Sequence, residues 1–227
     1  MTQQLLDLRK QQIVDLKKER WITTKAQVVV AMDYSGSMRS LYLDGTVQRL
    51  TEKLFPLALE FDDNGELDFY LFDNGVDKKP AVTMANYQNY VQTNCTGSMG
   101  CTSYAPVLQA IYKDKFSSGI FGFWTKTPDS PVYVIFITDG DNDDHSDTTA
   151  LIKEYSSKWM FVQFIGIGSE QFRFLQKLDD MQGRVLDNVD FFAVNNIDSM
   201  QSDELYSNLL TEFPEWVVSA KAKWFIK

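Results

Sequence analysis

Three oxygen-bearing side chains stand at alternate positions directly after a run of apolar residues. The run is VVVAM (28–32), and Asp33, Ser35 and Ser37 follow it. A continuously apolar run that begins with β-branched residues is typical of a strand covered on both faces. Because the chain then turns through Gly36, the three side chains can point into one small volume, where their oxygens suit a hard cation.

Two later segments carry further oxygen-bearing residues. The apolar run PVYVIFIT (131–138) also ends at a carboxylate, Asp139, and the loop GSMGCTSYAP (97–106) presents Thr102. In an open α/β sheet, ligands bind at the carboxyl ends of the strands, where the strand order reverses. If the first and fourth predicted strands are neighbours there, their loops meet in one crevice. The predicted ligand set is then Asp33, Ser35, Ser37, Thr102 and Asp139.

An all-oxygen ligand set favours Mg²⁺ or Mn²⁺, with Ca²⁺ as a further candidate. Zinc is disfavoured, because its usual protein ligands are nitrogen and sulfur. A purely structural interpretation is that Asp33 and Ser35 cap a helix and that Thr102 begins one. The spacing D-x-S-x-S after a buried strand, with a threonine and an aspartate on two later loops, favours the cation site.

Strands and helices are predicted to alternate along the chain. Besides the two runs above, strands are expected at LDFYLF (67–72), KPAVTMA (79–85), MFVQFIGIG (160–168) and around 190–194. Helices are expected over 3–20, 46–61, 104–116, 147–158, 172–178 and from 203 onward, with Pro56 kinking or bounding the second. This alternation predicts an α/β fold with a doubly wound, mostly parallel six-stranded sheet and helices on both faces.

Composition narrows the range of functions. The 227 residues are 44% hydrophobic and 23% charged, as in an ordinary globular domain. A net charge of −9 argues against nucleic acid as a partner, because phosphate binding needs a basic face. The chain opens with a polar segment, has no apolar run of about 20 residues and holds only two cysteines. We therefore expect a cytoplasmic protein without membrane insertion.

The predicted cation site resembles a known motif. DYSGSM (33–38), Thr102 and Asp139-Gly140 are similar to the metal-ion-dependent adhesion site (MIDAS) of von Willebrand factor A domains. From about residue 26 to the C-terminus, the chain resembles the bacterial tellurium-resistance, TerF-like branch of that family. The segments that carry this likeness are LFPLALEFDDNGELD (54–68), VTMANYQNYV (82–91), TSYAPVLQAI (102–111), VIFITDGDN (134–142), FIGIG (164–168) and FRFLQKLDDMQGRVLDNVDFF (172–192).

The resemblance implies a von Willebrand factor A domain over residues 26–227, after an N-terminal helical extension over residues 1–25. It also implies direct metal binding by the hydroxyls of Ser35, Ser37 and Thr102, with Asp33 and Asp139 acting largely through water. A cation held mostly by neutral hydroxyls keeps charge and an open position, which an Asp or Glu of a partner protein can fill. The implied role is a non-enzymatic protein-binding module in a bacterial tellurite or stress-response system.

The chain departs from the family pattern at one position of the third loop. The family usually shows Gly-Gly-Thr there, and Cys101 replaces the second glycine. If this position requires a positive φ, Cys101 is strained. The simpler interpretation is that Cys101 is a small residue that fills space. We expect Cys95 and Cys101 to be free thiols rather than a disulfide.

Other motifs are incomplete as enzyme or calcium signatures. Asp139, Asp141 and Asp143 match the first three ligand positions of an EF-hand loop, but Ala150 stands where the final acid is required. These acids are therefore expected to form a solvated loop, with a weak second cation site as the alternative. The segment GIG (166–168) lacks the third glycine of a dinucleotide-binding fingerprint.

Enzymatic alternatives find less support. A phosphotransferase would want an acid two residues after Asp33, where Ser35 stands. His145, the only histidine, is a candidate to activate a cysteine, but no third orienting group is evident. The main rival to protein binding is a metal-assisted hydrolase or phosphatase that uses Asp139 or Asp141 as its base.

Overall fold

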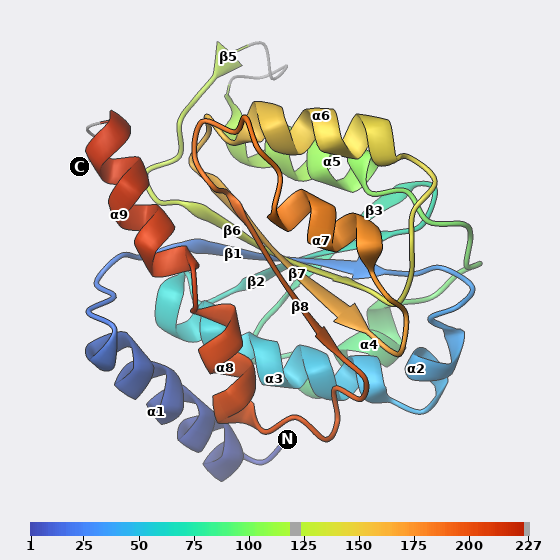
Figure 1. Cartoon of the computed structure of the whole chain (residues 1–227). Helices are drawn as coiled ribbons and strands as arrows, with labels where there is room; N and C mark the ends of the chain where they lie inside the picture. Colours follow the sequence, from blue (N-terminus) through green and yellow to red (C-terminus); the bar gives the residue numbers. More distant parts are fainter. Residues whose placement is uncertain (119–123, 225–227) are drawn as a thin grey trace.

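The computed structural model describes residues 1–118 and 124–224 and centres on a six-stranded sheet (Figure 1). The strand order is β3-β2-β1-β6-β7-β8, and every neighbouring pair is parallel except β2 and β3. The strands are β1 (Gln27–Asp33), β2 (Leu67–Phe72), β3 (Val76–Val82), β6 (Val132–Thr138), β7 (Met160–Ile167) and β8 (Val189–Val194). A separate small ribbon pairs β4 (Ser117–Ser118) with β5 (Trp124–Thr125). The predicted mostly parallel sheet is confirmed.

The two apolar runs that end in carboxylates are neighbours. β1 pairs with β6 in parallel, and both strands are buried on both faces. The strand order runs outward from this pair in opposite directions, through β2 on one side and β7 on the other. The sheet therefore reverses its order between β1 and β6, which is where an open α/β sheet places its ligand.

Helices cover both faces of the sheet, as the alternation predicted (Figure 1). One face carries α1 (Gln3–Glu19), α3 (Thr46–Phe61) and α8 (Ser202–Leu209), and the other carries α5 (Ala105–Phe116), α6 (His145–Tyr155) and α7 (Arg173–Asp179). The last helix is α9 (Phe213–Trp224). Three short helical segments, which periodicity did not predict, complete the described chain: α2 (Arg39–Leu43), η1 (Tyr87–Asn89) and α4 (Tyr90–Asn94).

Two predicted elements need comment. Pro56 marks no boundary, because α3 continues through it to Phe61 with Pro56 buried, and a kink at Pro56 stays a prediction. The second strand of the hairpin begins at Val76 rather than residue 79, since the turn after β2 is short. This edge strand contains two lysines and a proline, which disfavour pairing with a further strand. Because its first residues are largely polar, an apolar pattern in the sequence does not predict where it begins.

The N-terminal helix α1 is part of the packed structure. Leu6 and Ile13 are buried. Directly after α1, the Arg20 guanidinium donates hydrogen bonds to the backbone carbonyls of Ser207 and Leu210, at the end of α8. The terminal ammonium group lies 3.0 Å from the Glu52 carboxylate on α3. A division of the chain at residues 25 and 26 stays a prediction.

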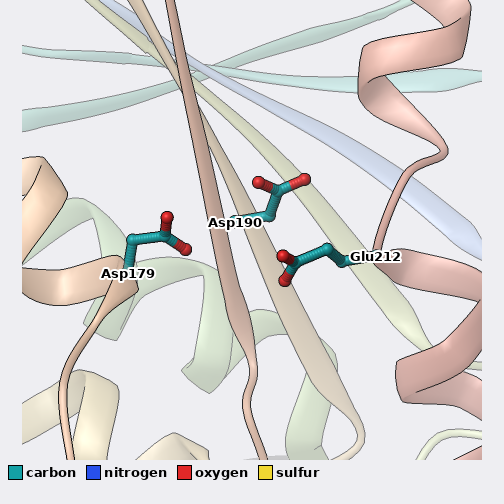
Figure 2. Close-up of side chains that lie close together, drawn as sticks. All are labelled: Asp179, Asp190 and Glu212. Carbon is teal, nitrogen blue, oxygen red and sulfur yellow. The ribbon is translucent and has the colours of Figure 1, made fainter.

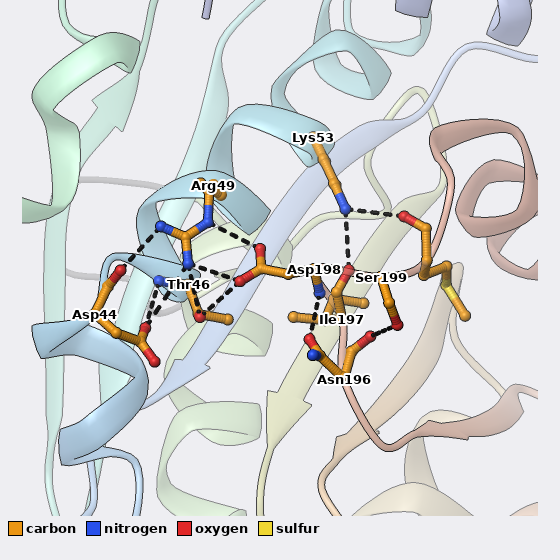
Figure 3. Close-up of polar contacts among 9 residues, drawn as sticks. Asp44, Thr46, Arg49, Lys53, Asn196, Ile197, Asp198 and Ser199 are labelled. Atoms are coloured by element: carbon orange, nitrogen blue, oxygen red, sulfur yellow. Dashed lines mark hydrogen bonds and ion pairs between the residues drawn. The ribbon is translucent and has the colours of Figure 1, made fainter.

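The loop between β8 and α8 is fastened to α3 by side chains of that helix (Figure 3). Arg49 Nη2 lies 2.6 Å from the Asp198 carboxylate, which also accepts a 2.9 Å hydrogen bond from the Thr46 hydroxyl. One turn further, the buried Lys53 ammonium donates to the carbonyls of Ile197 and Met200, at 2.9 Å each. These contacts fix the path of the chain as it leaves the edge strand.

Within residues 1–118 and 124–224, no helix combines the length and the apolar character needed to cross a membrane.

Candidate metal centre

Asp33 ends β1 and is fully buried, at 0% exposure. One carboxylate oxygen accepts the backbone N–H of Ser35 at 2.7 Å, and the other accepts the hydroxyl of Thr138 at 2.6 Å. Its own carbonyl accepts the hydroxyl of Tyr42 at 2.8 Å. Both carboxylate oxygens are thus engaged by the protein, so Asp33 holds the shape of the loop rather than presenting a free ligand.

Burial raises the pKa of Asp33 to about 6, even though its hydrogen bonds with Thr138 and Ser35 act to lower it. The nearby carboxylate of Asp139 raises the pKa of Asp33 further, as a smaller contribution. Two carboxyl groups close to one another, one of them fully buried, are stabilised by a cation between or beside them. The electrostatics of the loop therefore favour a bound positive charge.

A chain of hydroxyls connects β1 to the loop after β6. The hydroxyl oxygens of Ser35 and Ser37 are 3.0 Å apart, and the Ser37 hydroxyl donates to Asp139 Oδ1 at 2.8 Å. Because Ser37 has a single hydroxyl proton and gives it to Asp139, Ser35 must donate to Ser37. Oxygen lone pairs on both serines remain available, and Ser37 and Asp139 are open to solvent while Ser35 is buried.

The pKa of Asp139 is also raised, chiefly by burial, with the Ser37 hydrogen bond acting in the opposite direction. The structure thus brings four of the five predicted residues into one connected cluster: Asp33, Ser35, Ser37 and Asp139.

Thr102 reaches this cluster through its backbone. Its carbonyl accepts the N–H of Asp143 at 3.0 Å, and two residues earlier the Gly100 carbonyl accepts the N–H of Gly36 at 3.1 Å. Ser35 and Gly100 also form an isolated parallel bridge. Across the described part of the chain, no hydrogen bond joins the Thr102 hydroxyl to the other four residues. Its role as a direct ligand stays a prediction.

Three residues that sequence reasoning did not assign support the cluster. The Thr138 hydroxyl holds Asp33, and Tyr104 donates its own hydroxyl to the Gly140 carbonyl at 2.7 Å while lying 3.2 Å from Thr138 Oγ1. Asp144 accepts the backbone N–H groups of Tyr104 and of the first residue of α5, at 2.9 and 2.7 Å. Thr138 had a signal in the sequence, since it is the one polar residue that closes an apolar strand directly before Asp139.

The acids of the loop after β6 differ in their surroundings. Asp141 and Asp143 are exposed, as expected of a solvated loop, whereas the next acid, Asp144, is half-buried and accepts the N–H groups at the start of α5. Asp141 is exposed and pairs with His145 across 2.7 Å, and the His145 ring stacks on Phe174 at 3.9 Å. His145 is thereby engaged on its own loop and helix, away from any cysteine contact in the described chain.

The glycine that this loop needs is Gly100, not position 101. A Cβ atom on Gly100 would overlap the side-chain oxygens of Asn74 and Asp73, so a side chain there would have to displace both. Cys101 has no positive φ and is therefore unstrained. It is also exposed, so the interpretation that it fills space was wrong. Both cysteines are free, and burial raises the pKa of Cys95 to about 12, which suppresses any nucleophilic thiolate.

The donor set fits a hard divalent cation. Hydroxyl and carboxylate oxygens gather on the loops after β1 and β6, at the switch point of the sheet, while no histidine or cysteine enters the hydrogen-bonded cluster of described residues. The exposed Ser37 and the half-buried Asp139 offer oxygens that such an ion can reach. The buried Ser35 hydroxyl lies 3.0 Å from that of Ser37, and Thr102 lies on the adjoining loop. Asp33 and Thr138 hold the arrangement in place.

Solved structures share this fold at low sequence identity. The proximal thread matrix protein 1 of the mussel byssus aligns with a TM-score of 0.56 at 18% identity, covering 87% of this chain and 48% of that one. A further structure of that mussel protein has a zinc-occupied MIDAS motif, with a TM-score of 0.55. The VWA domain of SpRpn10 aligns with a TM-score of 0.53 at 14% identity, covering 83% of this chain and 96% of that one. The present chain thus spans about half of the mussel protein.

Relatives by sequence are closer. An uncharacterized protein of Bacillus subtilis (strain 168), YcbR, is 34% identical over 229 residues, which covers 98% of this chain and 90% of that protein. The family model described as the vWA found in the TerF C terminus matches residues 25–226. This match spans nearly the whole chain and includes every residue of the cluster. The chain therefore belongs to the TerF-like von Willebrand factor A domains.

Proposed function

We propose that this protein is a metal-dependent protein-binding module that captures a carboxylate of its partner at the loops after β1 and β6. The observation that carries the proposal is the hydroxyl chain Ser35–Ser37–Asp139 beside the buried Asp33. Thr102 is proposed as the third hydroxyl ligand. Von Willebrand factor A domains are generally interaction modules, which supports binding rather than catalysis.

The charge balance of the cluster suits this role. The accessible donors are largely neutral hydroxyls, and both oxygens of Asp33 are occupied by protein groups. A divalent cation at these residues would supply an open coordination position that a partner Asp or Glu can fill. Such a bond between cation and carboxylate is charge-assisted and works even for a protein whose net charge is −9.

The surface beside the cluster supports contact with a partner. A pocket lined in part by Gly36, Arg39 and Met99 flanks the loop. Arg39 is exposed and follows Ser37 by two residues, so it adds a positive charge at the rim. A partner that presents an acid to the cation would thus meet a cationic side chain and an apolar one next to it.

The choice of metal rests on the donor atoms. Hydroxyl and carboxylate oxygens favour Mg²⁺ or Mn²⁺, whereas the mussel protein carries zinc at its MIDAS motif. We propose Mg²⁺ as the physiological ion and include Mn²⁺ and Zn²⁺ in the test. A place in a cytoplasmic tellurite or stress response rests on the family's TerF name and on the two free cysteines.

The test is calorimetric titration of the full chain with MgCl₂, MnCl₂ and ZnCl₂, before and after the substitution Ser35→Ala/Ser37→Ala. The matched control is Ser40→Ala, an exposed serine on α2. We expect one Mg²⁺ site in the wild type and in Ser40→Ala, and its loss in the double variant. Equal Mg²⁺ binding by the double variant, or none by the wild type, would contradict the proposal.

A further inference from the structure

A second group of oxygen ligands lies around the edge strand β8. Asp179 ends α7, Asp190 is in β8, and Glu212 lies between α8 and α9. Their carboxyl groups point toward one another (Figure 2), and one oxygen from each lies within 4.8 Å of the others. Asp190 stands near the beginning of its strand, whereas Asp33 and Asp139 follow the ends of theirs. The group is therefore at the opposite end of the sheet from the candidate metal centre.

The negative charge of this group is poorly compensated. Burial first, and then repulsion from neighbouring acids, raises the pKa of Asp179 and of Glu212 to about 7 each. The Arg184 guanidinium lowers these two pKa values, and its effect is smaller than that of burial. It pairs with the carboxylate of Asp187 and donates hydrogen bonds to the backbone carbonyls of Asp179 and Met181. Among the described residues, no Lys, Arg or His forms an ion pair with any of the three acids.

A buried amide faces the same group. Gln163 on β7 is 0% exposed, and its amide oxygen makes no hydrogen bond. In the parallel pairing of β7 with β8, Gln163 is the register partner of Asp190, so their side chains leave the sheet on the same face. Burial raises the pKa of Asp190, and a hydrogen bond from the Gln163 amide acts to lower it. The amide therefore faces this group, and its buried oxygen costs free energy unless a ligand engages it.

We propose that Asp179, Asp190, Glu212 and the amide oxygen of Gln163 form a second divalent cation site, whose ion is Ca²⁺. All four donors are oxygens, as Ca²⁺ requires, and three of them carry charge. Ligands on opposite sides of a Ca²⁺ ion are about 4.6–5.2 Å apart, against about 4.0–4.2 Å for Mg²⁺. One oxygen from each of the three carboxylates lies within 4.8 Å of the others, so the three can bind one ion of this size together.

The residues around the second site provide an entrance for a cation and indicate what its binding would stabilise. Glu212 lines a pocket together with Asp187 and Glu215, which gives a cation an acidic entrance. A bound ion would join α7, β8 and the start of α9. The site would therefore stabilise the C-terminal part of the fold, and it is independent of partner capture at the other end of the sheet.

The test measures Ca²⁺ binding by the full chain in the Ser35→Ala/Ser37→Ala background, so that the first centre does not contribute. Calorimetry with CaCl₂ should show one site there, and Ca²⁺ at about a hundred times its Kd should raise the melting temperature by about 5–10 °C. Asp179→Asn and Glu212→Gln should abolish both the heat of Ca²⁺ binding and the Ca²⁺-dependent rise in melting temperature. The matched control Glu215→Gln, an exposed acid on the same pocket, should keep both.

The carboxamide variants remain informative about folding. Each removes one negative charge from a repelling group, so their melting temperatures without Ca²⁺ should equal or exceed that of the background protein. Absence of a Ca²⁺ shift in the background protein, or an equal shift in Glu212→Gln, would overturn the site. A response to MgCl₂ but none to CaCl₂ would overturn the choice of ion.

Discussion

At the residue scale, the central feature is the buried carboxylate of Asp33, which accepts hydrogen bonds from the protein instead of from solvent. Asp33 has no exposed surface, and both of its oxygens accept hydrogen bonds, from Ser35 and Thr138. This arrangement leaves the Ser37 hydroxyl and Asp139 toward the solvent, with the buried Ser35 hydroxyl beside Ser37. The buried Asp33 and its partner Thr138 thus orient the residues that face the cation. Interactions of this kind, one step removed from the ion, tune metal affinity in proteins.

The contribution of Thr138 can be measured with a substitution of similar shape. Thr138→Val removes the hydroxyl that donates to Asp33 at 2.6 Å, and we expect affinity for Mg²⁺ to fall by about 10–100-fold. Unfolding should cost about 1–3 kcal/mol less, because a buried acceptor loses its partner. The control is Thr51→Val, a buried threonine that donates to its own helix; an equal loss of Mg²⁺ affinity there would contradict the argument.

Raised carboxyl pKa values give the metal-free protein a defined pH dependence. The folded-state pKa is about 6 for Asp33 and about 7 for Asp179 and Glu212. Since these values exceed the ordinary ones, the three groups favour the folded state when protonated, and that stability is lost as the pH rises from about 4 through 7. Urea unfolding in the presence of EDTA should show lower stability at pH 8 than at pH 5. An increase in stability over this interval would refute the assignment.

At the scale of elements, the helix α3 secures the segment that follows the edge strand. Three of its side chains bind the loop between β8 and α8 (Figure 3). Arg49 and Thr46 share the carboxylate of Asp198, which lowers the pKa of that carboxyl, with the Arg49 hydrogen bond as the main cause. Lys53 instead satisfies backbone carbonyls that would otherwise be buried without donors.

Lys53→Met tests this fastening. The substitution keeps an unbranched apolar stem but leaves the carbonyls of Ile197 and Met200 without their donor. We expect the free energy of unfolding to fall by about 2–3 kcal/mol, which corresponds to a melting temperature about 4–12 °C lower. Lys113→Met on the exposed side of α5 is the control and should change the melting temperature by much less. Equal effects would show that the loop contacts carry no stability.

At the scale of the whole molecule, topology produces the candidate site. Parallel pairing of β1 with β6 places two strand ends side by side, and the strand order reverses between them. The loop that carries Thr102 joins them through the Gly100 carbonyl and the Ser35 bridge. Residues that are far apart in sequence thus meet at one edge of the sheet.

This topology explains what the sequence could reveal. The central strands are buried on both faces and read as apolar runs, so their number, their ends and the acids that follow them were predictable. The short helices α2 and α4 are five residues each and show no helical period. The group Asp179, Asp190 and Glu212 comes from three separate elements, and no spacing in the sequence relates its members.

The most direct test of the central claim is the effect of Mg²⁺ on the affinity for a carboxylate ligand. Binding of a short aspartate-containing peptide by the full chain would be measured in EDTA and again with saturating MgCl₂, for the wild type and for Ser35→Ala/Ser37→Ala. We predict that Mg²⁺ raises the affinity of the wild type by at least about tenfold, that the peptide tightens Mg²⁺ binding by the same factor, and that the double variant shows neither effect. Peptide binding that is equal with and without Mg²⁺ in the wild type would contradict metal-dependent carboxylate capture.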